Sequence, residues 1–135
     1  MGRPAGYLKA APGGRKIEPG GPMKDRLQSY EEFWPFYVSQ HLHRVNRALH
    51  FAGTTLVLVA LAAGVWIAPA WFAAAPLAGY GFAWVGHFFF EKNRPATFTY
   101  PLWSLRGDFR MYRLMLIGRM APEIARAERL FPVAA

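Results

Sequence analysis

The chain has no cysteine, which excludes a disulfide framework, a thiolate zinc site, an iron–sulfur cluster and a cysteine nucleophile. Charge is also missing from a long block, because 43 consecutive residues between Arg47 and Glu91 include no Asp, Glu, Lys or Arg. The net charge of +8 would by itself favour a nucleic-acid partner. A soluble nucleic-acid binder does not place a third of its chain in a charge-free block, so we expect no nucleic-acid partner and predict a membrane protein.

Residues 1–22 lack apolar periodicity and are rich in Gly and Pro. Such a segment buries too little apolar surface to offset the entropy of ordering it, and we predict a disordered N-terminal extension. It also lacks the apolar core of a signal peptide. Met23 is an alternative start of the chain, and we expect one helical domain over 23–131.

An aromatic pattern with spacings of three and four runs from Gln28 to about Arg44 and predicts a helix. Its aromatic residues are Tyr30, Phe33, Trp34, Phe36 and Tyr37. Aromatic side chains with acidic residues opposite them are typical of an amphipathic helix in the membrane interface, which is our prediction. The alternative is a helix that turns this face towards the core of a bundle.

Two apolar segments, about 49–68 and 71–90, are each long enough to cross a bilayer as a helix. Pro69 lies in the short connection and ends the first helix. Neither segment has a polar stripe, so we predict a transmembrane hairpin, and the fold class is an all-α membrane protein with flanking interfacial helices. Lys and Arg flank both outer ends and the turn carries no charge, which places both termini on the cytoplasmic side.

After the hairpin, Pro95 and Pro101 predict an irregular stretch over 91–104. A helix over 108–117 follows, with Gly118 as its stop, and a last helix is expected over 122–130. Three arginines in and just before the first of these helices suit an anionic membrane surface; they are Arg106, Arg110 and Arg113.

Two of the four histidines, His50 and His87, lie inside the charge-free block, where ionisable groups are costly and are functional candidates. If the turn centres near residue 70, antiparallel helices place the two histidines at nearly the same depth. Stripes of small residues, typical of close helix packing, end at both histidines. We therefore expect the two imidazoles to converge, and together with Glu91 they would form a two-histidine, one-carboxylate site of the kind that binds Fe(II). The alternative is that these histidines cap helix ends or bond to lipid headgroups.

A third imidazole would come from the segment before the hairpin. His41 is out of helical phase with His50 and needs a break in the chain, whereas His43 is in phase but about 10 Å away. Spacing alone therefore favours His43. Asn46, one turn before His50, is a candidate to orient a ligand.

Two further polar residues have open roles. Arg94 is a candidate for binding the carboxylate of an acidic lipid, or else pairs with Glu91 or a phosphate. Asp108 caps the helix that follows, or it orients an imidazole.

The run GHFFFEKNRPATF, over 86–98, and the shorter segments YVSQH and HFAGT, which begin at Tyr37 and His50, make the chain resemble the short bacterial branch of the Mpo-type family. The resemblance covers roughly 23–120. It implies a membrane-bound Fe(II)-dependent dioxygenase that uses dioxygen to shorten 2-hydroxy fatty acids by one carbon.

The resemblance also implies that His41, His50 and His87 hold the metal, with Glu91 in the adjacent motif, and it favours His41 over His43. It places the protein in a bacterial inner membrane. Two rival hypotheses are a non-catalytic membrane protein that binds lipid or a partner helix, and a metal-binding scaffold without redox chemistry. A homo-oligomer stays open, because small-residue stripes serve contacts within and between chains equally well.

Overall fold

The computed structural model describes residues 9–11, 15–17 and 26–132. Strands β1 (Lys9–Ala11) and β2 (Arg15–Ile17) pair antiparallel, and the other elements of the described chain are helices joined by short connections. The other residues of the segment 1–22 lie outside the described ranges, so its disorder stays a prediction. The helices are α1 (Tyr30–Ser39), α2 (Arg44–Trp66), η2 (Pro69–Ala73), α3 (Ala74–Val85), η3 (Gly86–Glu91), η4 (Ala96–Phe98), α4 (Pro101–Leu116) and α5 (Met120–Leu130).

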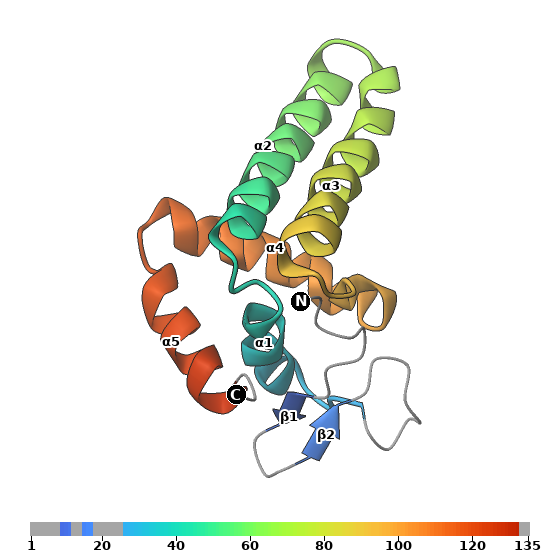
Figure 1. Cartoon of the computed structure of the whole chain (residues 1–135). Coiled ribbons are helices and arrows are strands. Elements are labelled where there is room, and N and C mark those ends of the chain that lie inside the picture. The colour runs from blue at the N-terminus through green and yellow to red at the C-terminus, as the bar shows by residue number, and fades with distance from the viewer. Residues whose placement is uncertain (1–8, 12–14, 18–25, 133–135) are drawn as a thin grey trace.

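Helices α2 and α3 form an antiparallel hairpin that projects from the remaining helices (Figure 1). The first arm begins earlier than predicted, at Arg44, because the His43 ring accepts a hydrogen bond from the Val45 amide and caps it. The second arm is divided into the 3₁₀ turn η2, the α-helix α3 and the π-helical turn η3. Within the described residues, α2 alone is long and apolar enough to cross a membrane, so the hairpin is observed but its second span is not confirmed.

Small residues bring the two arms together, as the stripes predicted. A Cβ added at Gly53 would lie 2.9 Å from Cβ of Phe82, and one at Gly79 would lie 3.2 Å from Cγ2 of Val57. Near the turn, Gly64 leaves room for the ring of Phe72. The glycine backbone of one arm therefore packs against side chains of the other arm. Larger residues at these glycine positions would hold the two helices further apart.

The aromatic face of α1 is in the protein core, so the interfacial prediction for this helix is wrong and the alternative holds. Phe33, Trp34 and Tyr37 are almost completely buried and form a core with residues of α4 and α5, among them Met111 and Phe131. An aromatic helix facing lipid and one facing a small core have the same periodicity, which is why the sequence pattern did not separate them.

Helix α4 starts at Pro101, which corrects the irregular stretch predicted over 91–104. Proline has no amide hydrogen to donate and suits the first turn of a helix, where that hydrogen has no acceptor within the helix. Gly118 ends the α4 segment with a φ of +67°, as predicted. Two arginines of α4 lie over aromatic rings of α1: the Arg106 guanidinium is 3.9 Å from the Tyr30 ring centre and that of Arg110 is 4.2 Å from the Trp34 ring centre. Their contact with an anionic membrane surface stays a prediction.

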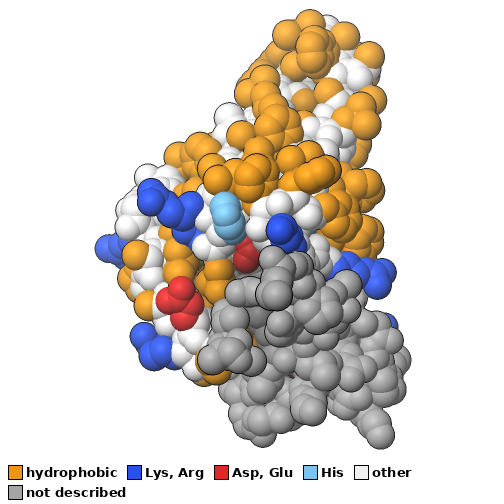
Figure 2. All heavy atoms as spheres, viewed as in Figure 1, with side chains coloured by type: hydrophobic (Ala, Val, Ile, Leu, Met, Phe, Trp, Pro, Cys, Tyr) orange, Lys and Arg blue, Asp and Glu red, His pale blue; other side chains and the backbone are white. Residues whose placement is uncertain are grey.

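Side chains on the outside of the hairpin are apolar over its whole length, and the charged groups gather around its base (Figure 2). Trp66 at the turn is 82% exposed and Leu77 on α3 is 76% exposed. Exposed apolar surface of this extent marks a membrane or protein interaction site.

Candidate metal centre

Three buried histidines converge where the hairpin meets the other helices. Nε2 of His50 lies 3.2 Å from Nε2 of His41 and 3.2 Å from Nε2 of His87. One nitrogen from each ring lies within 4.8 Å of the other two. His50 comes from α2 and His87 from η3, while His41 lies in the connection between α1 and α2.

The opposite nitrogen of each ring has an acceptor outside the cluster. Nδ1 of His41 donates to the Tyr37 carbonyl at 2.6 Å, Nδ1 of His87 donates to Oδ1 of Asn93 at 2.6 Å, and Nδ1 of His50 lies 3.2 Å from the Asp108 carboxylate. These acceptors place the ring proton on Nδ1, so all three Nε2 lone pairs point at one another.

Three lone pairs at this separation repel unless a cation lies among them. The donor set and its outer hydrogen bonds therefore fit a metal ion, for which neutral imidazoles oriented by a carbonyl or carboxylate are the common arrangement.

A break between α1 and α2 brings His41 into the cluster. The Glu91 carboxylate accepts hydrogen bonds from the amides of Leu42 at 2.9 Å and His43 at 2.8 Å, and the Arg47 guanidinium donates to the carbonyls of His41 and Leu42. The out-of-phase spacing of His41 and His50 is therefore resolved by a chain turn that the start of α2 and the end of η3 hold in place.

Glu91 was expected as a ligand, but the structure gives its carboxylate this different task. Both oxygens accept backbone hydrogen bonds, and Glu91 is not a member of the three-residue cluster. His43, which helical phase favoured, is exposed and caps α2. The centre consists of three imidazoles, without a carboxylate among the grouped ligand atoms.

The remaining candidates have different outcomes. Asp108 contacts His50 and accepts a hydrogen bond from the Tyr37 hydroxyl, as expected of a residue that orients a ring. It is not a helix cap, because α4 begins before it.

Asn46 is completely buried against Gly86, and its side chain has no hydrogen-bond partner within the described residues. Arg94 is exposed over the Phe98 ring and does not line the cavity described below.

Burial controls the protonation of the groups on the α1 side of the centre. It lowers the pKa of His41 well below 6.5, and positive charge on His50 or His87 would lower it further. Burial, followed by the Asp108 charge, raises the pKa of Tyr37 well above 10. His41 is thus kept neutral, as a metal ligand must be. Tyr37 stays protonated, and its hydroxyl donates a hydrogen bond to the Asp108 carboxylate.

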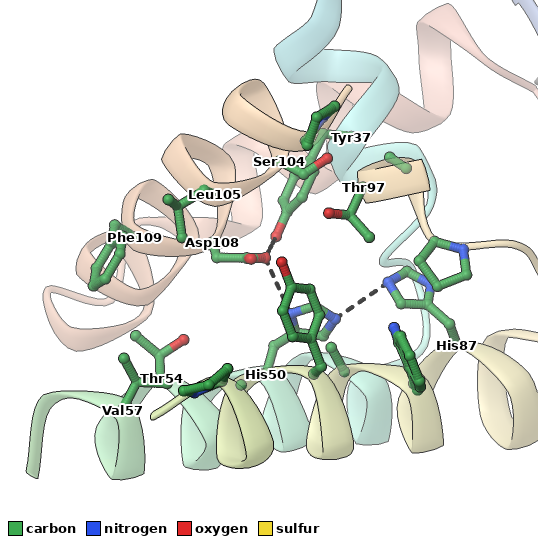
Figure 3. Close-up of a pocket in the computed structure, with 18 of the residues that line it drawn as sticks. Tyr37, His50, Thr54, Val57, His87, Thr97, Ser104, Leu105, Asp108 and Phe109 are labelled. Atoms are coloured by element: carbon green, nitrogen blue, oxygen red, sulfur yellow. Dashed lines mark hydrogen bonds and ion pairs between the residues drawn. The ribbon is translucent and has the colours of Figure 1, made fainter. Parts of the chain in front are cut away.

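A cavity of about 350 Å³ opens beside the cluster, between the hairpin and α4 (Figure 3). Its polar lining includes the three imidazoles, Asp108 and Ser104, and its other lining is largely apolar. The Ser104 hydroxyl is buried and has no hydrogen-bond partner within the described residues. The volume is in the range of sites that bind small molecules, and the lining suits an amphiphile with its polar end at the imidazoles.

Sequence reasoning missed Asn93 and Ser104. Asn93 orients His87 and donates to the carbonyl and the side chain of Gln40. The position of Asn93, six residues after His87, was the one feature of the sequence that could have pointed to it. No feature of the sequence pointed to Ser104.

The fold and the site thus define a small helical protein with a three-histidine centre at the head of an apolar cavity. The chain matches, over residues 27–120, the family described as 2-hydroxy-palmitic acid dioxygenase Mpo1-like, and it belongs to that family. No curated protein and no solved structure matches the chain.

Proposed function

We propose that this protein is an Fe(II)-dependent dioxygenase that shortens 2-hydroxy fatty acids by one carbon. The observation that carries the proposal is the set of three inward-facing Nε2 atoms, each on a ring whose Nδ1 has its own acceptor. His41, His50 and His87 would hold the ion. When bound, iron supplies the Lewis acidity and redox capacity that the reaction of a 2-hydroxy acid with dioxygen requires.

The protein's own groups bind and orient the substrate. The apolar lining of the cavity takes the acyl chain and keeps water from the centre, while the unpaired Ser104 hydroxyl donates a hydrogen bond to the polar head. Among the described residues no Lys or Arg lines the cavity, so the ion itself would balance the substrate carboxylate. This arrangement replaces the earlier candidate, Arg94.

We also propose that the hairpin lies in a bacterial inner membrane with both termini on the cytoplasmic side. The exposed apolar length of the hairpin and the charges at its base support this placement. Because the chain has no cysteine, single cysteines at Ala70 and Arg119 can be labelled in intact cells with a membrane-impermeant maleimide. Labelling of Ala70→Cys without Arg119→Cys is the expected result, and the reverse pattern would contradict the orientation.

The deciding experiment is the metal content of protein purified anaerobically in detergent, followed by oxygen uptake with 2-hydroxyhexadecanoate and with hexadecanoate. We expect about one iron per chain in the wild type, none in His50→Ala, and full content in the matched control His43→Asn, which keeps a capping side chain. Uptake should require the 2-hydroxyl group.

A wild type that binds no metal after Fe(II) reconstitution would overturn the proposal. The apolar cavity would then favour the alternative function, lipid binding without catalysis.

A further inference from the structure

The cavity has two chemically different ends. His87 and Thr97 lie at one end, and Val57 and Phe109 lie at the other (Figure 3). Beyond Val57 the lining continues on α3 to Ala75, which is buried. A chain molecule with its polar head at the imidazoles would therefore extend along the hairpin towards its turn.

The helices give the length of this path. His50 and Val57 are seven positions apart on α2, which is about 10 Å, and Ala75 precedes His87 by twelve positions, which is about 18 Å. An extended acyl chain advances about 1.25 Å per carbon, given carbon–carbon bonds of about 1.5 Å, so these distances correspond to roughly 8 and 14 carbons.

Val57 lines the cavity between these two points. Its Cγ2 atom would lie 3.2 Å from a Cβ at Gly79, so this side chain occupies the space that the glycine leaves between the two arms. Val57 thus lies beside the path towards Ala75, and a larger side chain at residue 57 would leave less room there.

We infer that Val57, with Ala75 behind it, sets the length of the acyl chain that the cavity accepts. This inference rests on the proposed function for the identity of the polar head. It concerns the far wall of the cavity, which makes no contact with the three imidazoles, so the two claims can fail separately.

The test is native mass spectrometry of the purified protein in detergent, incubated with an equimolar mixture of saturated 2-hydroxy acids from 2-hydroxyoctanoate to 2-hydroxyoctadecanoate. The mass of the retained acid reports its length directly, and no turnover is needed. The variants are Val57→Phe, Val57→Ala and Ala75→Val. The matched control is Val59→Phe, which adds the same volume at a residue that is 58% exposed and does not line the cavity.

We expect Val57→Phe to shift the retained acids by about two carbons towards shorter chains, because the larger ring extends roughly 3 Å further into the path. Val57→Ala should shift them towards longer chains, Ala75→Val should remove the longest, and Val59→Phe should match the wild type.

The same length distribution in all variants would overturn the inference, and so would a wild type that retains none of the acids. Retention with the expected shifts in a protein that consumes no oxygen after Fe(II) reconstitution would support the inference while the proposed function fails.

Discussion

The hairpin and the helices at its base bury their side chains in opposite ways. In the hairpin, glycines let α2 and α3 touch, and large apolar side chains such as Val65 and Leu77 stay on the outside. At the base, the large side chains such as Trp34 and Phe131 are inside and the charged ones are outside. The base thus has the burial pattern of proteins in water, and the hairpin has a packing pattern that is typical of helices in lipid.

The three-histidine centre depends on both regions. The hairpin supplies His50 and His87, while the base supplies His41 and two of the acceptors that orient the rings, the Tyr37 carbonyl and Asp108. Neither region has the complete set, so the centre exists only while the two are docked. The following predictions separate or sharpen these contributions.

Gly86→Ala should have the largest effect, because it opens the contact between α2 and η3. The new Cβ would lie 2.0 Å from Oδ1 of Asn46, which is completely buried, and 3.3 Å from its Cα atom. We expect a loss of about 1–3 kcal/mol in the free energy of unfolding, with weaker iron binding. Gly81→Ala is the control, since its Cβ meets nothing and should stabilise α3 by about 0.5–1 kcal/mol. Equal thermal unfolding of both variants in detergent would contradict the prediction.

Glu91→Gln tests the turn that positions His41. An amide offers one acceptor oxygen for two backbone donors, so we expect a loss of about 1–3 kcal/mol. Iron affinity should fall because His41 is less firmly held. The X-ray absorption spectrum of the remaining bound iron should not change, whereas loss of an oxygen ligand from that spectrum would show that Glu91 binds the metal directly.

Asp108→Asn tests the contribution of the base to His50. The substitution keeps the size of the side chain and removes the charge that faces Nδ1 at 3.2 Å. We expect iron to bind about 10- to 100-fold more weakly, as measured by competition with a chelator. Asp108 also accepts from Tyr37, so Tyr37→Phe is the companion variant: it removes that hydrogen bond and keeps the carboxylate. If the two variants lose the same affinity, the negative charge of Asp108 beside His50 is not the cause.

Acidification should destabilise the metal-free protein. The pKa of His41 is below 6.5 in the folded state because the side chain is buried. As the pH falls, His41 therefore binds a proton in the unfolded chain before it does so in the folded chain. The stability from this group is present above about pH 6.5 and is lost as the pH falls. Thermal unfolding between about pH 7.5 and 5 measures the effect, and His41→Gln should flatten the profile. A wild-type profile as flat as that of the variant would be evidence against a buried neutral imidazole.

Arg110→Met should have the smallest effect and should be confined to the base. It removes the cation over Trp34 and the 4.0 Å ion pair with Glu123 while keeping much of the aliphatic length. We expect a loss of about 0.5–1 kcal/mol with unchanged iron content. Arg113→Met, at an exposed position of the same helix, is the control and should be close to neutral.

The sequence predicted what depends on regular helices. The convergence of His50 with His87 followed from their similar distances to the turn and from the small-residue stripes. A regular helix has a fixed rise and rotation per residue, so the sequence positions of two residues predict their depth and their face. The role of Asp108 beside an imidazole was one of two alternatives, and the structure decided between them.

What the sequence did not predict depends on contacts between distant segments. The turn that brings in His41 needs Glu91, and the orientation of His87 needs Asn93, whose other partner is Gln40. The burial of the α1 aromatic face likewise depends on α4 and α5, which come much later in the chain. Periodicity in a local window has no information about such partners.

The hydrogen bonds from Leu42 and His43 to Glu91 also determine when the centre can form during synthesis. His41 leaves the ribosome first of the three ligands, but Glu91, whose carboxylate fixes its turn, follows 50 residues later, and Asp108 later still. Until those residues have emerged and folded back, the chain has imidazoles but no site. The three-histidine centre is thus completed late in synthesis, and a chain truncated before α4 would lack Asp108, the acceptor that faces His50.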